Sequence, residues 1–249
     1  MHNSPFISII TVVKNDPSGL QKTLESVIEQ DFNNYEYIII DGASKDSTVD
    51  VIKNYESSIN YWISESDNGI YDAMNKGISV AKGEWIHLLN ASDYYVDSSV
   101  LDKVSRLLIF PEKFFYYFTL KRIIGEREEF YGWEYRPWKL WYSCCIPQPT
   151  MLVSKRAYDC VGIFDTQYKV SADHEMTLRL IKQGYLPVFN NITTTAMPYG
   201  GLSSFNIEES FDEFRRLTIN HGLNRMFAYL LFRVKVLKYK YYVARRYRV

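Results

Sequence analysis

The first hundred residues alternate between short apolar runs and segments whose apolar residues recur at helical spacing. Such runs predict strands at 6–12, 37–40, 61–64 and 85–89, and the first, rich in Ile and Val, is predicted to be buried. Apolar residues three and four apart predict helices between these strands, one beginning at Pro17, one around Val51 and Ile52, and one over 70–81. Strands that alternate with helices at this spacing predict a mostly parallel sheet with right-handed crossovers, and therefore an α/β fold.

Beyond about residue 110 the pattern is less regular. An aromatic stretch at 114–118 precedes a charged segment and a Trp-rich loop, and helices are predicted at 173–183 and from a capping box at Asn206 and Glu209 to about Asn220. No Gly/Ser-rich or Pro-rich linker divides the chain. We therefore expect one domain over residues 1–223, with halves at 1–110 and 111–223, followed by a further segment at 224–249.

Composition narrows the class of protein. The 249 residues are 47% hydrophobic and 23% charged, which excludes a mainly disordered chain. Lys plus Arg number 29 and balance 29 Asp plus Glu, so general binding of polyanions is not expected. Cys144, Cys145 and Cys160 form neither a CxxC pair nor an even-numbered framework, which argues against a zinc site and a disulfide scaffold and favours a reducing compartment.

Polar side chains follow each of the four predicted strands. They are Lys14 to Asp16, Asp41, Glu65 with Asp67, and Asn90 to Asp93. Loops after parallel strands converge on one edge of the sheet, where open α/β proteins bind ligands, so these residues are expected to line one site. Each also has a structural alternative, because Asp16 and Asp93 can cap helices and Asp41 with Ser44 can form a turn.

Five segments of the chain carry a resemblance to a known family. In order they are SIITVVKND, YIIIDGASKDSTVDVI, SESDNGIYDAMNKGISVAKGEWIHLLNASD, PQPTMLVSKRAYDCVGIFD and SADHEMTLRL. Over residues 5–205 the chain resembles the family 2 glycosyltransferases of the GT-A fold, and the run at 64–93 is the most specific part. The resemblance implies a nucleotide-binding half at 1–110 and an acceptor-binding half at 111–223. It also implies transfer of a sugar from a nucleotide-diphosphate donor with inversion, as in bacterial capsule, O-antigen and exopolysaccharide synthesis.

The resemblance implies Mn²⁺ or Mg²⁺ as cofactor, because a hard cation neutralises a diphosphate leaving group through oxygen ligands. Asp93 is the candidate metal ligand. The family usually shows Asp-x-Asp at this strand end, whereas this chain has Asn90, Ala91, Ser92 and Asp93 and so keeps a single carboxylate. His221 is a weaker candidate ligand near the C-terminus.

The resemblance also assigns residues to the nucleotide sugar. They are Thr11, Val13, Asp41, Asp67, Asp72, Asn75, Lys76, Asn90, Ala91, Ser92 and Gln148. Asp41 resembles the family's acceptor for the imide N–H of uracil, which favours a UDP-sugar. Guanine offers comparable N–H donors, so Asp41 leaves the base open. An ordinary solvated helix face is the alternative for Lys76.

Inverting transfer needs a base that takes the proton of the attacking acceptor hydroxyl. The segment SADHEMTLRL resembles the family segment that holds this base, which makes Asp173 the candidate catalytic residue and Glu175 a nearby second carboxylate. A helix N-cap is the structural alternative for Asp173. Trp133 is a candidate for stacking on an acceptor sugar, with simple burial as its alternative.

The segment 225–249 holds eight basic residues and no acidic residue, interleaved with large apolar side chains. This composition is typical of a helix that lies on an anionic membrane surface. Nucleic acid and the chain's own domain are the alternatives. Because the resemblance implies a lipid-linked saccharide acceptor, we favour the membrane and expect no nucleic-acid partner. The sequence leaves the oligomeric state open.

The N-terminal residues lack a basic region followed by a long apolar core, and no apolar run reaches the roughly 18 residues of a membrane span. We therefore expect a cytoplasmic protein, peripheral on the inner face of the bacterial cytoplasmic membrane. The main alternative to an enzyme is a catalytically silent nucleotide-sugar-binding or membrane-surface scaffold, which would not need a base at Asp173. A nucleotidyltransferase is disfavoured because VVKNDPSG is not a Gly-rich loop.

Overall fold

The computed structural model describes residues 4–143, 145–200 and 207–246. Its first half contains four parallel strands in the order β3-β2-β1-β4. They are β1 (Ile7–Val13), β2 (Tyr35–Asp41), β3 (Tyr61–Ser64) and β4 (Trp85–Leu88). Each lies within two residues of its predicted position. β1, β2 and β4 are mainly apolar and almost wholly buried, whereas β3 at the edge of the sheet is only partly buried. The predicted α/β fold is confirmed.

The second half extends the same sheet with mixed pairing. β8 (Leu152–Ser154) pairs antiparallel with β4, and β6 (Phe114–Ile124) pairs antiparallel with β8 and parallel with β9 (Leu186–Pro198). β5 (Tyr94–Tyr95) and β7 (Arg127–Tyr131) add antiparallel edges. The register between β6 and β9 shifts at Thr119, and such irregularities bend a strand and increase its twist.

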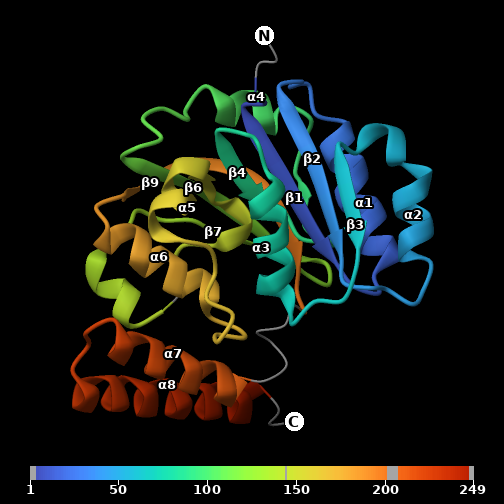
Figure 1. Cartoon of the computed structure of the whole chain (residues 1–249). Helices are drawn as coiled ribbons and strands as arrows, with labels where there is room; N and C mark the ends of the chain where they lie inside the picture. Colours follow the sequence, from blue (N-terminus) through green and yellow to red (C-terminus); the bar gives the residue numbers. More distant parts are fainter. Residues whose placement is uncertain (1–3, 144, 201–206, 247–249) are drawn as a thin grey trace.

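Helices cover both faces of this sheet (Figure 1). α1 (Pro17–Ile28), α2 (Thr48–Asn54) and α4 (Val100–Ser105) pack on one face, and α3 (Ile70–Val80), α5 (Lys155–Val161) and α6 (Ala172–Lys182) pack on the other. Alternate residues of β1 enter the two cores, with Ile9 in one and Ile10 in the other. Short 3-10 turns lie at Glu56–Ser58, Pro137–Trp141 and Gln148–Thr150.

A helical hairpin forms a further layer beside α6 (Figure 1). α7 (Ile207–Asn220) and α8 (Arg225–Arg246) pack against each other, and Leu217 of α7 joins the core that contains α6. The helix α7 agrees with the predicted one, although Asn206 of its capping box lies outside the described residues. Among the described helices, none combines the length and the apolar composition that a membrane crossing requires.

Candidate functional site

Two adjoining cavities lie beyond the carboxyl ends of the parallel strands. The first, of about 780 Å³, is lined by residues that follow β1 and β4, and we call it the sheet-edge cavity. The second, of about 870 Å³, lies between β6, β7 and the α7–α8 hairpin, and we call it the outer cavity. Six residues line both, namely Gln148, Pro149, Val170, Asp173, Met197 and Tyr199. The two cavities therefore meet, with Asp173 at their junction.

The segment Asn90–Asp93 lines the sheet-edge cavity, and a hydrogen-bonded turn fixes it there. Asp16 accepts a bond from the Gly19 N–H at 2.9 Å, which caps α1, and its other oxygen accepts from the Ser92 hydroxyl at 2.8 Å. Ser92 has a φ of 75°, in the left-handed region that most residues avoid. The cap predicted at Asp16 thus also ties the loop after β4 to the start of α1.

Asp93 is a buried carboxyl group that lines this cavity, with an exposed fraction of 5%. Burial raises the pKa of Asp93 well above its usual range, because the charged form loses its hydration. Its side chain does not cap α4, whose N-cap is Ser99. A cation that entered the cavity would replace the lost hydration and stabilise the carboxylate.

Asn90 supplies a second oxygen to the same place. Its Oδ1 atom is buried and has no hydrogen-bond partner among the described atoms. A buried acceptor without a partner is costly, and a bound ligand or the water shell of a metal ion would satisfy it. Asp93 and Asn90 therefore fit the oxygen chemistry of Mg²⁺ or Mn²⁺. No group of three His, Cys, Asp or Glu side chains in the described part of the chain could hold a metal ion, so a bound molecule would have to supply further ligands.

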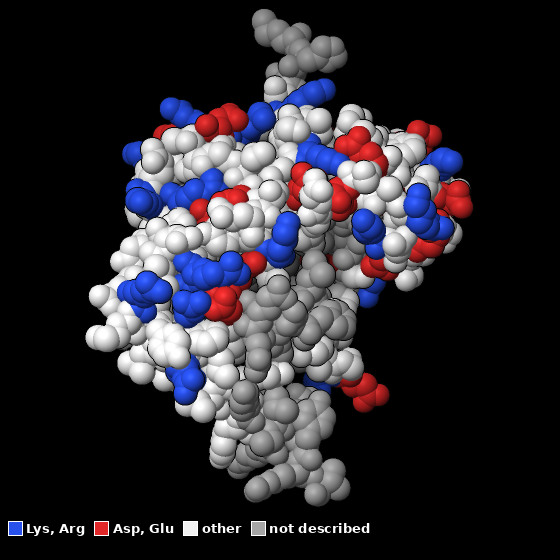
Figure 2. Space-filling model, turned by 60° about the horizontal axis from the view of Figure 1, so that its bottom comes forward, with Lys and Arg blue, Asp and Glu red and all other residues white. Residues whose placement is uncertain are grey.

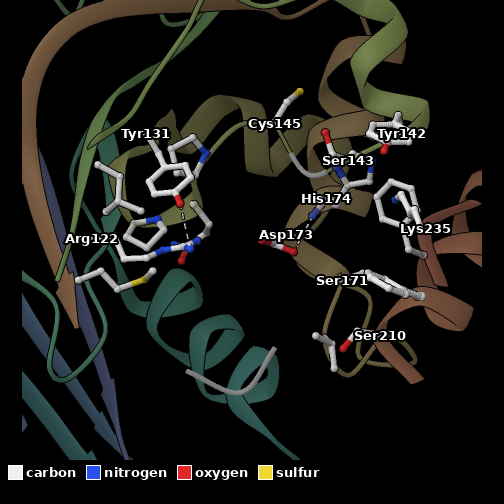
Figure 3. Close-up of a pocket in the computed structure, with 18 of the residues that line it drawn as sticks. Arg122, Tyr131, Tyr142, Ser143, Cys145, Ser171, Asp173, His174, Ser210 and Lys235 are labelled. Carbon is white, nitrogen blue, oxygen red and sulfur yellow. Dashed lines mark hydrogen bonds between the residues drawn. The ribbon is translucent and has the colours of Figure 1, made fainter. Parts of the chain in front are cut away.

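Asp173 lies in the first turn of α6 and lines both cavities. Figure 3 shows its side chain pointing into the outer cavity. Its Oδ1 atom accepts a bond from the His174 N–H at 2.8 Å and lies 3.3 Å from the Tyr71 hydroxyl. The N-cap of α6 is Ser171, so the capping role considered for Asp173 is not the one observed. The position suits a group that acts on molecules bound in both cavities.

Glu213 of α7 holds the segment that leads into α6. Its buried carboxylate accepts bonds from the backbone N–H groups of Lys169, Val170 and Ser171, at 2.7, 2.8 and 2.7 Å. These donors precede the helix whose first turn carries Asp173. Sequence reasoning missed Glu213, because nothing in the local pattern distinguishes it from other glutamates on α7.

We expect Glu213→Ala to destabilise the protein by about 2 kcal/mol or more, since it removes the acceptor of one buried and two partly buried N–H donors. Asp212→Ala is the matched control, because its carboxylate is more exposed and its partners include Arg215 and Arg216. Loss of exposed pairs of this kind typically costs less than about 1 kcal/mol. Urea unfolding of both variants measures the difference, and equal stabilities would contradict the role given to Glu213.

Several residues assigned to the nucleotide sugar from the sequence are engaged within the protein. Asp41 is fully buried and accepts bonds from the Ser44 N–H at 3.0 Å and the Ser64 hydroxyl at 2.5 Å, as its turn alternative predicts. Thr11 donates to the Leu89 carbonyl at 2.7 Å, and Val13 is buried at the end of β1. None of these three is among the described residues that line either cavity.

The residues predicted around the start of α3 also stay outside the described linings. Both ends of the Asn75 amide bond to the backbone of Phe164, at 2.9 and 2.8 Å, so that Asn75 holds a loop. Lys76 pairs with Glu65 at 2.8 Å. Asp67 lies 3.9 Å from Lys14, and Asp72 accepts from the Asn68 N–H at 2.9 Å.

The remaining predicted residues are Gln148, Trp133 and Glu175. Gln148 lines both cavities and donates to the Leu88 carbonyl at 3.1 Å. Trp133 lines the outer cavity. Glu175, two residues after Asp173 on α6, is buried and pairs with Arg179 at 2.8 Å and His221 at 3.2 Å. Burial alone would raise the pKa of Glu175, but the bonds from His221 and Arg179 lower it overall. His221, the weaker candidate metal ligand, is therefore paired with Glu175, which is far from Asp93 in the sequence.

Comparison with known proteins agrees with this architecture. The family model described as glycosyl transferase family 2 matches residues 8–162 and ends before Asp173. An uncharacterised glycosyltransferase of Mycobacterium tuberculosis is 31% identical over 185 residues, 72% of this chain and 70% of that protein. A PGL/p-HBAD biosynthesis glycosyltransferase of Mycobacterium bovis is 24% identical over 215 residues, 84% of this chain and 83% of that protein.

Two solved structures are similar in fold. S. aureus TarS 1–349 in complex with UDP-GlcNAc superposes with a TM-score of 0.70 at 15% identity, over 91% of this chain and 70% of that one. The Pyrobaculum calidifontis mannosyltransferase PcManGT, in complex with GDP-Man and Mn²⁺, gives the same score and identity over 93% and 70%. At such identities the likeness shows the fold alone.

Proposed function

The chain belongs to glycosyl transferase family 2 and has the GT-A fold, and from this premise we propose that it is an inverting hexosyltransferase. The donor is a nucleotide-diphosphate sugar, with UDP-hexose or UDP-N-acetylhexosamine favoured. The acceptor is a hydroxyl of a lipid-linked saccharide in bacterial surface polysaccharide synthesis. The observation that carries the proposal is the place of Asp173, between a cavity with Asp93 and Asn90 and a second cavity with aromatic walls.

The reaction follows from that arrangement. A donor in the sheet-edge cavity directs its diphosphate toward Asn90 and Asp93, and the acceptor hydroxyl enters from the outer cavity. Asp173 takes the proton of that hydroxyl as its oxygen bonds to the anomeric carbon, while the bond from this carbon to the diphosphate breaks and the configuration inverts. The Tyr71 hydroxyl and the His174 N–H keep the Asp173 carboxylate oriented.

A divalent ion bound by Asp93 and the diphosphate would supply charge neutralisation for the leaving group. Asn90 is suited to bind a ribose hydroxyl or a water of that ion, since its Oδ1 atom is buried without a partner among the described atoms. Gln148, at the junction, is suited to contact the transferred sugar. The other assigned residues, Thr11, Val13, Asp41, Asp67, Asp72, Asn75 and Lys76, remain proposals for the nucleotide region.

The test is a panel of nucleotide sugars, namely UDP-glucose, UDP-galactose, their N-acetylamino forms and GDP-mannose. Each is incubated with the purified chain and Mn²⁺, and release of nucleotide diphosphate is measured. We expect one UDP-sugar to be hydrolysed, with the rate abolished by EDTA. Donor binding without release from any sugar would favour the alternative of a catalytically silent nucleotide-sugar-binding protein.

We also propose that α8 lies on an anionic membrane surface. A stripe of exposed residues runs along its outer side at helical spacing, and we call Met226, Tyr229, Leu230, Leu237 and Tyr241 the outer stripe. Their exposed fractions lie between 53% and 82%. Arg233 is exposed on the same side of the helix. Figure 2, which brings this end of the molecule forward, shows several Lys and Arg side chains beside uncharged surface.

The outer stripe predicts binding to anionic vesicles. Leu230→Ser with Leu237→Ser should weaken binding to vesicles that contain phosphatidylglycerol, because each substitution removes apolar area that the lipid would cover. Binding should also fall with salt, since each basic residue near the surface contributes about 1 kcal/mol. Ile109→Ser with Phe130→Ser is the control, because these residues are exposed elsewhere. Equal co-sedimentation of the two variants would exclude the membrane role of the stripe.

A further inference from the structure

The inner side of α8 forms a wall of the outer cavity. Lys235 and Lys238, one turn apart on α8, line this cavity together with Tyr142. The Lys238 ammonium donates to the Tyr142 hydroxyl at 3.2 Å, and the Lys235 ammonium lies 5.3 Å from the centre of the Tyr142 ring. Figure 3 shows Lys235 and Tyr142 on one side of Asp173, with Arg122 and Tyr131 on the other.

The described side chains that line this cavity carry more positive than negative charge. Among the described residues that line it, Arg122, Lys235 and Lys238 are cations, whereas Asp173 is the sole carboxylate. Burial, with a smaller contribution from the charge of Lys235, lowers the pKa of His174 to about 4, so this side chain is neutral near pH 7. The Nε atom of Arg122 is buried and has no hydrogen-bond partner among the described atoms. An anion that entered the outer cavity would meet an attractive potential.

Aromatic rings surround the same lysines. The Lys235 ammonium lies 3.6 Å from the centre of the Phe214 ring and 5.9 Å from that of Phe211. Rings attract an ammonium group by its charge and leave that charge in place. Further rings in the lining, those of Tyr131, Trp133 and Tyr239, offer apolar surface to the rest of a ligand. The cavity thus combines a cationic wall with surface suited to a sugar ring or an alkyl chain.

We propose that Lys235 and Lys238 bind a phosphate group of the acceptor lipid, so that α8 recognises the acceptor with its inner side. This inference rests on the proposed function, because it takes the outer cavity as the acceptor site. Lysine ammonium groups bind phosphate as point charges, and two of them one turn apart can contact one diphosphate. The outer stripe, proposed to face the membrane, lies on the opposite side of the same helix. A lipid on that membrane would therefore be close to Lys235 and Lys238.

The experiment measures binding of farnesyl diphosphate, farnesol and inorganic pyrophosphate to the full chain by equilibrium dialysis in EDTA. The variants are Lys238→Met and Lys235→Met/Lys238→Met, with Lys53→Met/Lys182→Met as the control that removes two exposed lysines outside both linings. We expect the wild type to bind farnesyl diphosphate more tightly than either other probe. The double variant should lose about tenfold or more of that affinity, the size expected for charge-assisted bonds, and the control should lose none.

Three outcomes would overturn the inference. They are equal affinity for farnesyl diphosphate and farnesol, pyrophosphate binding as tight as that of the lipid, and an affinity unchanged by removal of the lysines. A role of Lys235 only in packing would lower the melting temperature of the double variant without changing the ratio of diphosphate to alcohol affinity. Lys238→Met keeps the test decisive, because Lys238 is exposed and contacts Tyr142, whereas Lys235 packs on Phe211 and Phe214. Hydrolysis of the nucleotide sugar by the same proteins tests the proposed function separately.

Discussion

Asp173→Asn should lower the rate of sugar transfer by about 100-fold or more while leaving donor affinity nearly unchanged. The amide keeps the size of the side chain and can still accept the His174 N–H, but it cannot take a proton from the acceptor hydroxyl. The bonds to His174 and Tyr71 fix the group at the junction of the cavities, so the loss should appear in kcat and not in the donor KM.

Single-turnover transfer and titration calorimetry with the donor measure the two quantities for Asp173→Asn. Asp159→Asn is the control, because Asp159 is an exposed carboxylate on α5 that lines neither cavity. A folded Asp173→Asn protein that transfers sugar at a near-normal rate would remove Asp173 from the mechanism. Weakened donor binding with unchanged turnover would instead assign this carboxylate to the donor.

The sequence predicted which residues follow the parallel strands and line the sheet-edge cavity after β1 and β4. Asn90 and Asp93 follow β4, and parallel strands present such residues at one edge, so their place beside the loop after β1 follows from topology. Asp173 lies 80 residues after Asp93 in the sequence, and only its resemblance to a family segment suggested that the two belong to one site. In the structure, Asp173 lines both cavities at the place where they meet.

Side-chain partners across long loops were beyond sequence reasoning. The helix face that carries Asn75 was predicted, but its amide is bonded to Phe164, 89 residues away, and no local pattern reports that contact. Gly83 lies three residues beyond the end of α3 at Val80. The reason for a glycine there is a close approach, because a Cβ atom would lie 2.5 Å from the backbone nitrogen of Ser8.

For the basic C-terminal segment, too, the sequence could not predict which side chains contact the rest of the protein. Its composition predicted a helix and a surface for anions, yet composition does not say which residues face the protein. The packing of α8 on α7 divides the helix into an outer stripe around Leu230 and Leu237 and an inner side with Ala228 and Lys235. The docking of α8 on its own domain, considered as an alternative to the membrane, is therefore observed for the inner side.

Asp93→Asn tests the metal site through both function and stability. The variant should lose metal-dependent donor binding, by about tenfold or more, because the neutral amide is a poorer ligand for a hard cation. Calorimetric titration with UDP, with Mn²⁺ or with EDTA, measures this effect. Donor affinity that is indifferent to EDTA in the wild type, or to the substitution, would exclude the proposed ion at Asp93.

The same substitution should stabilise the ligand-free protein at neutral pH. Burial raises the pKa of Asp93 in the folded state, so the folded state favours the neutral acid, and stability is lost as pH rises from the unfolded pKa through the folded one. Asparagine removes that loss, and each kcal/mol gained should raise the melting temperature by about 2 to 4 °C. The gain, measured in EDTA, should be larger at about pH 8 than at about pH 4.

Asp97→Asn is the opposite control, since the Ser99 hydroxyl bond lowers the pKa of Asp97, and this variant should not gain stability. A loss of stability in Asp93→Asn at both pH values would show that the carboxylate already has a stabilising partner within the folded chain.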